Sequence, residues 1–303
     1  MIASGEWIVF RGQGFDPAYL RHVLMSDPFH AQFMQTVAGV GGSLLRARPA
    51  QVASIRIPFP DIREQQRIAA ILDKADAIQR KRQETIRLLQ ELRSSSFLRL
   101  FGDPVANPKK WPDETFDAHI VQIQYGPRFF NQPYTETGPR IVRITDLDHN
   151  GGLDFEAMPR MEVSEEDKRN YCLQPGDLIL ARSGATVGKT ALIEQRAPEC
   201  IAGAYFIRLR FGNGIHPRYA QMVLSSRSVQ AIIANQSRQS AQQNFNGPAI
   251  RRLPLPRPPY DLQEKFVQTY DHLTRLLNLA EVHQAACADL FNALVQRAFC
   301  GEV

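Results

Sequence analysis

The longest regular pattern in the chain is helical and runs from Asp61 to Phe101. No Gly or Pro lies between Asp61 and Gly102, and at 1.5 Å per residue about forty residues make a rod of roughly 60 Å, a length typical of a spacer or clamp. Arg82 and Thr85 interrupt its apolar stripe. The stripe has the three-then-four spacing of a coiled-coil seam and consists of Ile68, Ile71, Ala75, Ile78, Leu89 and Leu92.

A second long helix is predicted for the last forty or so residues, from Asp261 onward. We expect it to pair antiparallel with the first helix. Asp261 is a candidate N-cap with Glu264 as its capping-box partner, and Asp61 with Glu64 repeats this device. Its predicted stripe comprises Phe266, Leu273, Leu276, Ala280, Cys287, Leu290 and Leu294.

An internal repeat appears when the sequence is aligned with itself at a shift of about 200 residues. Its matching blocks are Ile2–Arg11 with Ile201–Arg210, Pro17–Ser26 with Pro217–Ser226, Pro58–Glu64 with Pro258–Glu264, and Phe101–Asp103 with Phe299–Glu302. The repeat predicts four parts: the rear half of a first domain (1–60), a long helix and linker (61–104), a complete domain (105–260) and a second long helix (261–303).

On this reading Met1 falls about a hundred residues into a complete unit, so we expect the first unit to lack its front. A sheet edge around Ile2–Phe10 would then be unpaired and would seek a partner. We expect self-association or binding of a separate front fragment. Two copies joined through their helices would present two identical complete domains related by symmetry.

The complete domain is predicted to mix strands and helices. Apolar runs predict strands at 139–147, 177–182, 190–194 and 204–211. Helices are expected over 217–236, a polar loop over 239–247 and an extended, Pro-bearing lead over 253–259. The predicted fold class is α+β, in which a globular α/β domain alternates with long helices that pair as an antiparallel coiled coil.

The amino-acid composition restricts the possible functions only weakly. The 303 residues carry a net charge of +5 with a pI near 9.1, a weak bias toward a polyanionic partner. The four cysteines form no C-x-x-C pair and have no histidine at a metal-ligand spacing, so we expect reduced thiols, no disulfide framework and no metal. No signal peptide and no run of 18 apolar residues is found. A cytoplasmic protein is expected.

Three motifs suggest catalysis and each has a simpler structural explanation. Gly184–Thr190 has only three residues between its glycines, and its continuation as a strand favours a hairpin turn over a phosphate loop. Arg257–Tyr260 resembles an adenine methyltransferase loop, but a guanidinium offers no hydrogen-bond acceptor. Glu165–Asp167 is interpreted as a solvated helix start and not as a metal site. The charged run Arg80–Arg82, which does not suggest catalysis, is interpreted as a solvated helix face, with partner or phosphate contact as the minor alternative. We therefore expect a protein without catalytic residues or a bound cofactor.

The candidate chemistry is DNA contact. The stretch Gln236–Asn246 is rich in amides and includes an arginine, the side chains that bind base edges bidentately; an ordinary polar loop is an equally open interpretation. Other basic side chains are candidates for phosphate contact. The full set of candidates is Arg128, Arg140, Arg143, Arg182, Lys189, Arg238, Gln242, Gln243, Asn244 and Asn246.

Longer motifs give the chain a family resemblance. They are Ile57–Ile68, with Pro-Asp-Ile-Arg-Glu-Gln-Gln at its centre, Leu72–Asp76, Leu100–Pro104 and Leu173–Thr190. With these motifs the chain resembles the specificity subunit of Type I restriction-modification enzymes.

The resemblance implies two target recognition domains separated by two long antiparallel helices, each domain reading half of a split DNA site. It implies double-stranded DNA, methyltransferase (modification) subunits and restriction (endonuclease and translocase) subunits as partners, with catalysis in those subunits. Here the front of the first recognition domain has no counterpart. The alternative is a truncated or silent cassette that acts only as a protein-interaction scaffold.

Overall fold

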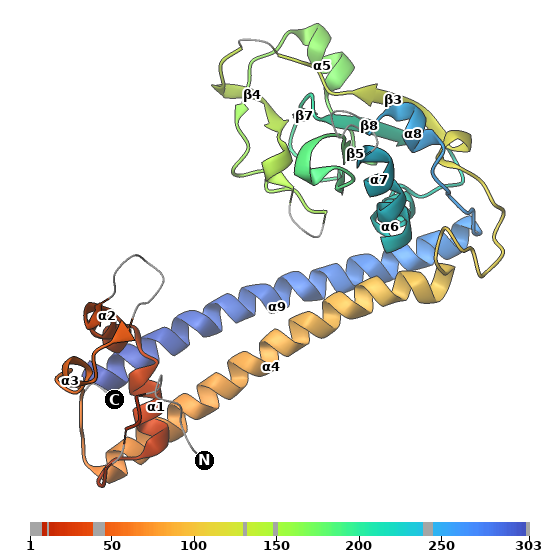
Figure 1. The fold of residues 1–303 in the computed structure, drawn as a ribbon. Coiled ribbons are helices and arrows are strands. Elements are labelled where there is room, and N and C mark those ends of the chain that lie inside the picture. Colours follow the sequence, from red (N-terminus) through yellow and green to blue (C-terminus); the bar gives the residue numbers. More distant parts are fainter. Residues whose placement is uncertain are drawn as a thin grey trace. The chain divides into compact units, whose positions relative to one another are not determined.

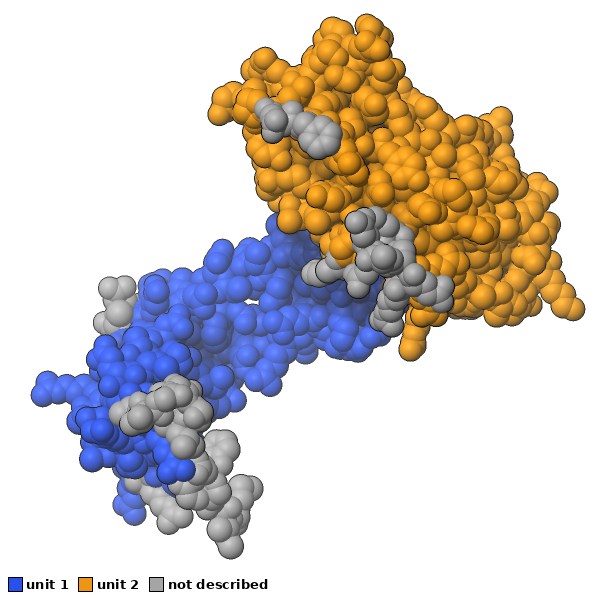
Figure 2. Space-filling model, turned by 45° about the horizontal axis from the view of Figure 1, so that its top comes forward, with its two compact units in different colours: residues 1–91, 275–303 blue, residues 92–274 orange. Residues whose placement is uncertain are grey.

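The computed structural model describes residues 8–10, 12–38, 46–129, 132–147, 151–238 and 245–300. Figure 1 shows the fold and labels most of its helices and strands. The chain forms two compact units: unit 1 contains residues 1–91 and 275–303, and unit 2 contains residues 92–274, coloured separately in Figure 2. Both long helices contribute to both units. Each unit is described by itself.

Unit 1 combines short helices with the start of one long helix and the end of the other. Its short elements are α1 (Pro17–Leu24), α2 (Asp27–Gln35), the antiparallel pair β1 (Val37–Ala38) and β2 (Arg46–Ala47), and α3 (Pro49–Val52). The Asp16 side chain caps α1 and the Ser26 side chain caps α2, and each helix has a proline in its first turn. Ile8–Phe10 form no strand, so the predicted strand is wrong for these residues; Met1–Trp7 lie outside the described residues.

The two long helices are confirmed as α4 (Ile62–Phe101) and α9 (Tyr260–Cys300). Asp61 caps α4, because its carboxylate accepts hydrogen bonds from the backbone N–H groups of Arg63 and Glu64. The Glu64 carboxylate pairs with Arg67 and does not complete the predicted capping box.

The predicted cap of α9 is wrong. Tyr260 already belongs to the helix, so Asp261 lies inside the first turn, and the carbonyl of Pro259 accepts the N–H groups of Leu262 and Gln263. An acidic residue in the first turn still complements the helix dipole.

The two helices pair antiparallel, as predicted. In unit 1, Ile68 and Leu72 near the start of α4 share a core with Phe291 and Ala298 near the end of α9, and the Gln79 amide donates to the Cys287 carbonyl over 3.3 Å. In unit 2 the end of α4 packs against the start of α9, because Phe97 and Phe101 contact Phe266.

The predicted face of α9 needs correction. Leu276 and Leu290, which were placed in the seam, have 39% and 60% of their surface exposed. The adjacent Leu277 and Phe291 face inward instead. One row of buried and half-buried residues follows a strict alternation of four and three: Phe266, Tyr270, Leu273, Leu277, Ala280, Gln284, Cys287, Phe291, Leu294 and Ala298.

The stripe of α4 needs the same correction. Ile78 and Leu92 are exposed, whereas Gln79 and Arg82 are half-buried. Arg82 therefore belongs to the stripe that it was predicted to interrupt, and Thr85 is exposed.

Unit 2 is built around a four-stranded antiparallel sheet. Its strand order is β3 (Ile120–Tyr125), β8 (Phe206–Phe211), β5 (Leu178–Ala181) and β6 (Thr190–Leu192). A separate parallel pair joins β4 (Thr135–Val142) to β7 (Cys200–Ala202). Helices α5 (Glu165–Tyr171), α6 (Pro217–Ser225), α7 (Arg227–Arg238) and α8 (Gly247–Arg251) complete the unit.

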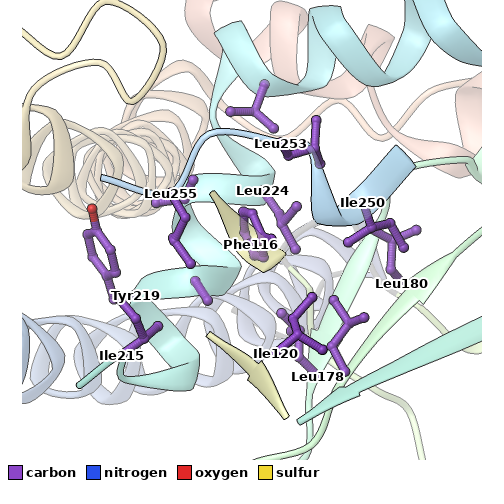
Figure 3. Close-up of a cluster of buried hydrophobic side chains, with 14 of the residues drawn as sticks. Phe116, Ile120, Leu178, Leu180, Ile215, Tyr219, Leu224, Ile250, Leu253 and Leu255 are labelled. Atoms are coloured by element: carbon purple, nitrogen blue, oxygen red, sulfur yellow. The ribbon is translucent and has the colours of Figure 1, made fainter. Parts of the chain in front are cut away.

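Both faces of this sheet are covered, because side chains alternate along each strand. Leu178 and Leu180 point into one core, with Tyr219 and Leu224 of α6 and Phe116 (Figure 3). Ile179 belongs to a second core beneath β4 and β7. The four residues of β5 are consequently all buried, and they anchor the loops that follow the strand.

The strand predictions are confirmed in part. Strands β5, β6 and β8 lie within the predicted segments, and β4 overlaps the segment 139–147 but ends at Val142, where Arg143 caps the short 3-10 helix η2 (Ile144–Asp146). Strand β3 was missed because three of its six residues are exposed and two are glutamines. Strand β7 has only three residues and gives little periodic signal.

The internal repeat is also present in the structure, but the residues that correspond differ by two positions from the sequence match in one block. The Tyr19 hydroxyl donates to the Pro58 carbonyl in unit 1, and the Tyr219 hydroxyl donates to the Pro256 carbonyl in unit 2. Pro58 therefore corresponds to Pro256, not to Pro258 as the sequence match indicated. This two-residue offset places the starts of α4 and α9 at equivalent positions.

Candidate nucleic-acid interface

A cavity of about 1130 Å³ opens on unit 2 beside β4 and the ends of β3 and β5. Three of the arginines predicted to contact DNA, Arg128, Arg143 and Arg182, line it together with two tyrosines. The remaining lining residues are Pro127, Phe129, Ile141, Val142, Ile144, Thr145, Met161, Ser183, Gly203, Ala204 and Phe206.

One wall depends on a close backbone approach at Gly126. Its N–H donates to the Phe206 carbonyl over 3.0 Å, and a β-carbon at this position would overlap the carbonyl oxygen of Gly203. Glycine permits this approach because it has no side chain. The segment that carries Arg128 is therefore held against the turn that carries Tyr205.

Arg182 follows β5 and is fixed through its backbone and its side chain. Its N–H donates to the Tyr205 carbonyl and its carbonyl accepts the Phe245 N–H, both over 2.8 Å. Its guanidinium carbon lies 4.8 Å from the ring centroid of Tyr125, the geometry of a cation–π contact.

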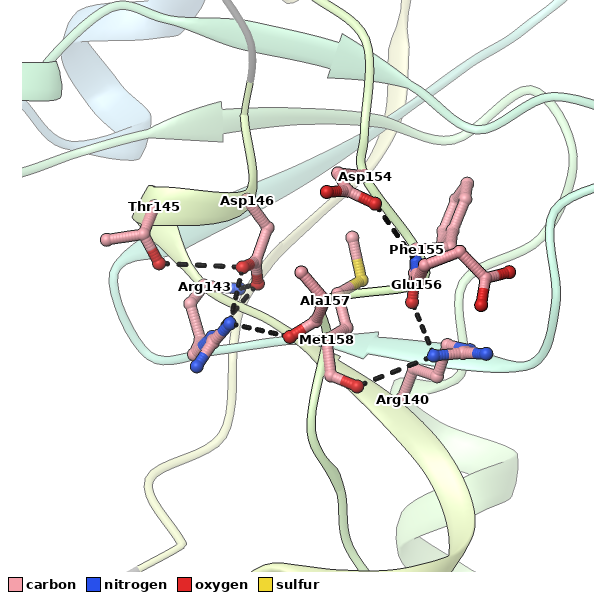
Figure 4. Close-up of polar contacts among 9 residues, drawn as sticks. All are labelled: Arg140, Arg143, Thr145, Asp146, Asp154, Phe155, Glu156, Ala157 and Met158. Atoms are coloured by element: carbon pink, nitrogen blue, oxygen red, sulfur yellow. Dashed lines mark hydrogen bonds and ion pairs between the residues drawn. The ribbon is translucent and has the colours of Figure 1, made fainter.

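Arg143 is part of the cavity wall, and its side chain is hydrogen-bonded to other residues of the same unit (Figure 4). Its guanidinium forms two hydrogen bonds with the buried Asp146 carboxylate, of 3.1 and 2.7 Å, and a third with the Ala157 carbonyl. The hydrogen bonds to Asp146 raise the pKa of Arg143 above its ordinary value. Few of its donors remain for a ligand.

Arg140 is similarly bound to its own domain and does not line the cavity. Its guanidinium donates to the carbonyls of Phe155 and Met158 (Figure 4), while its Nε atom is buried without a partner among the described residues. Its contacts hold the segment after Asp154 against β4.

Arg128 and Lys189 are the other predicted phosphate ligands. Arg128 is exposed on the cavity rim and has no hydrogen bond or ion pair among the described residues. Lys189 lies elsewhere, in a second cavity of unit 2, of about 630 Å³, together with Arg227 and Gln230. The structure therefore does not bring all the predicted cations together.

The amide-rich stretch is only partly described. Gln242, Gln243 and Asn244 lie outside the described residues, and Arg238 is the last residue of α7. Asn246 caps α8, because its side-chain oxygen accepts the Ala249 N–H over 3.0 Å. Phe245 is buried and bound to Arg182, so the end of the predicted reading stretch is anchored beside the cavity.

Sequence reasoning missed two aromatic residues of the cavity. Tyr134 and Tyr205 expose 57% and 61% of their surface there. Tyrosine and arginine side chains are both among the groups that contact the phosphates of duplex DNA. The signal available in the sequence was Gly203-Ala204-Tyr205, an aromatic residue directly after a turn-forming pair.

The motifs that suggest catalysis have structural roles. Gly184–Thr186 form a 3-10 turn between the antiparallel strands β5 and β6, as predicted, and no helix follows to receive a phosphate. Glu165 begins α5 as predicted. Burial raises the pKa of Cys172 to about 11 and that of Cys200 to about 12, which keeps both thiols protonated. Within the described parts of the chain, no group of three or more potential ligands could hold a metal ion.

The described helices also include none with the length and apolar character needed to span a lipid bilayer.

Comparison with known proteins connects this architecture to a family. A family model described as Type I restriction modification DNA specificity domain matches residues 19–88 and 120–285. The chain is 23% identical over 324 residues to the EcoKI specificity subunit of Escherichia coli K12, covering 98% of this chain and 67% of that protein. It is 24% identical over 308 residues to the StySPI specificity subunit of Salmonella potsdam, covering 95% and 65%. The chain thus spans about two thirds of the length of these curated relatives.

Solved structures share the fold. The S subunit of a Type I restriction-modification system from M. genitalium matches with a TM-score of 0.62 at 15% identity, over 93% of this chain and 72% of that one. The HsdS subunit from Thermoanaerobacter tengcongensis matches with a TM-score of 0.52 at 19% identity, over 96% and 72%.

The family model covers more than half of the sequence, so the chain belongs to the family of Type I restriction-modification DNA specificity domains. The resemblance inferred from the Pro-Asp-Ile-Arg-Glu-Gln-Gln passage is confirmed, as is the predicted fold class.

Proposed function

We propose that this chain is the non-catalytic DNA-recognition subunit of a Type I restriction-modification complex and acts in the cytoplasm. Residues 105–260 form its reading domain and bind one half-site in duplex DNA. The helical segments 61–104 and 261–303 set the spacing of the assembly and dock the methyltransferase and restriction subunits. Residues 1–60 supply the rear part of a first recognition domain.

The cavity beside β4 is the observation that carries this proposal. It combines two arginines that have no ion pair among the described residues, Arg128 and Arg182, with two exposed tyrosines. Arginine forks bind phosphates and base edges bidentately, and tyrosine hydroxyls form hydrogen bonds to DNA phosphates. This chemistry agrees with the family to which the chain belongs.

The long helices support the docking role. Leu276, Leu279, Val282 and Leu290 of α9 leave apolar surface exposed. Apolar side chains on a helix provide the contact area that partner helices use. Catalysis is assigned to the partners, since the relatives are named as specificity subunits.

A band-shift titration of the full chain, with and without its modification subunits, tests the proposal on a random duplex pool at several salt concentrations. We expect the logarithm of affinity to fall linearly with the logarithm of salt concentration. Replacement of Arg128 by Ala should weaken binding to all duplexes and reduce that slope by about one phosphate contact. Replacement of Arg169 by Ala, an exposed residue of α5 outside the cavity, is the matched control.

If neither the chain nor its complex binds duplex DNA in a salt-dependent manner, the proposal fails. The chain would then be a protein-interaction scaffold without DNA binding.

A further inference from the structure

We propose that Arg182, stacked on Tyr125, reads the major-groove edge of a guanine in the DNA target. This inference rests on the proposed function and adds to it the residue that specifies a base. Arg182 would donate two parallel hydrogen bonds to the O6 and N7 atoms of that guanine.

The first step of the argument is that the Arg182 side chain is oriented before any ligand binds. The guanidinium lies over the Tyr125 ring, 4.8 Å from its centroid. Tyr125 is itself fixed, because its hydroxyl accepts the Gly247 N–H over 3.0 Å. A stacked guanidinium has a defined plane, so little side-chain entropy is lost when it binds a planar acceptor pair.

The second step is that Arg182 has free donors among the described residues. None of these residues forms a hydrogen bond or ion pair with its guanidinium nitrogens. Arg143 on the same cavity instead uses its Nε and one terminal nitrogen on Asp146 and Ala157. Because Arg182 lines the cavity, its terminal nitrogens are available to a ligand there.

The third step distinguishes a base from a phosphate. Phosphate contacts need only a flexible cation at the surface, the situation of the exposed Arg128. Arg182 is half-buried, its backbone is bound to Tyr205 and Phe245, and its guanidinium is held over the Tyr125 ring. A planar fork fixed in direction suits the coplanar O6 and N7 acceptors of guanine, the commonest specific partner of arginine.

The position of Arg182 in the chain supports the same assignment. Its carbonyl receives the N–H of Phe245, the residue at which the amide-rich stretch returns to the described structure. Tyr125 in turn binds the following turn through Gly247. The Arg182–Tyr125 pair is therefore linked by hydrogen bonds to Phe245 and Gly247, the residues on either side of Asn246.

The test is a selection from a random duplex library with the full chain and its modification subunits, comparing wild type with Arg182→Lys. Lysine keeps the charge but loses the fork. We expect one guanine position of the selected site to lose its preference by about 5- to 150-fold, with the other positions and the salt slope unchanged. Tyr125→Leu should weaken the same preference because the guanidinium plane is released, whereas Tyr125→Phe keeps the ring and should retain most of it.

Arg169→Lys is the matched control and should leave every position unchanged. Thermal melting verifies that the variants fold, which we expect because the hydrogen bonds of Arg182 to Tyr205 and Phe245 use backbone atoms.

An unchanged guanine preference in Arg182→Lys overturns the inference. So does an Arg182→Ala variant that loses affinity uniformly for all sequences with a smaller salt slope, because that result identifies a phosphate contact. A wild-type complex that binds no DNA at all contradicts the proposed function itself, so the two failures are distinguishable.

Discussion

Gln65 and Gln263 make the same hydrogen bonds in the two halves of the chain. Each lies in the first turn of a long helix with none of its surface exposed. Each amide oxygen accepts a backbone N–H over 2.8 Å, and each amide nitrogen donates to two backbone carbonyls. The partners are Asp16, Gly14 and Pro60 for the first glutamine, and His216, Gly214 and Pro258 for the second.

This pair explains why glutamine occurs at both sites. One buried amide satisfies three backbone groups of the segments that lead into α1 and α4 in unit 1, or into α6 and α9 in unit 2. Glutamine supplies an acceptor and two donors on one planar group, which a carboxylate or an apolar side chain cannot do. The glutamine therefore positions the short helix against the long helix within each unit.

Gln263→Ala should lower the free energy of unfolding by about 2–4 kcal/mol, because it leaves buried backbone groups without partners. Gln65→Ala should have an effect of similar size, since the contacts are equivalent. Urea denaturation followed by circular dichroism measures both. Gln268→Ala, at an exposed position of α9, is the control and should change stability by less than about 0.5 kcal/mol. A Gln263→Ala variant as stable as that control would contradict the assignment.

A second prediction concerns the seam of α9. Leu277→Lys should destabilise the chain strongly, because Leu277 is only 2% exposed and the change buries an unpaired ammonium. Leu276→Lys, one residue away, should be tolerated because its charge reaches solvent. The double change of Leu276 and Leu290 to lysine, which the sequence pattern suggested would break the helix pairing, should leave the melting transition nearly unchanged. An equal loss of stability in Leu276→Lys and Leu277→Lys would contradict the observed burial of Leu277 and exposure of Leu276.

These residues show what the sequence could and could not predict. The existence and approximate bounds of α4 and α9 followed from a helical period in long segments without Gly or Pro. The buried face did not, because adjacent apolar residues such as Leu276 and Leu277, or Leu290 and Phe291, satisfy a helical period equally well. Only packing against the other helix selects one of each pair.

The candidate site was predictable only as a set of residue types. The arginines were chosen because arginine binds phosphates and bases, but long-range contacts decide which of them have free donors. Asp146 takes two of the Arg143 donors, whereas among the described residues the cation–π contact with Tyr125 leaves the Arg182 donors open. Tyr134 and Tyr205 have no periodic signal, since their exposure depends on strands distant in sequence.

A third prediction is a pH effect through His216. Burial lowers the pKa of this imidazole below its ordinary 6.5, and the neighbouring Arg218 lowers it further. The neutral ring also caps α6, where Nδ1 accepts the Arg218 N–H over 3.1 Å. Below about pH 6.5 the unfolded state therefore binds a proton that the folded state binds only at lower pH, and the free energy of unfolding falls as the pH drops.

His216→Asn keeps a capping acceptor but does not titrate. Denaturation at about pH 7.5 and about pH 5.5 should show a smaller loss of stability in this variant than in the wild type, because one source of the loss is removed. The comparison cancels the titration of other groups, which both proteins share. An equal loss in the two proteins would show that His216 does not contribute.

The last prediction separates the two arginines on the cavity that were both predicted to bind phosphate. Arg143→Ala leaves the buried Asp146 carboxylate without its guanidinium partner, so the free energy of unfolding should fall by about 1–3 kcal/mol. Part of this loss should be recovered in the double change of Arg143 and Asp146 to alanine, a coupling of about 1–2 kcal/mol.

Arg128→Ala should leave stability unchanged and reduce only DNA affinity, because Arg128 has no partner among the described residues. If instead Arg143→Ala unfolds like the wild type and weakens DNA binding as Arg128→Ala does, then Arg143 exchanges Asp146 for a phosphate, and the cavity wall does not depend on this ion pair.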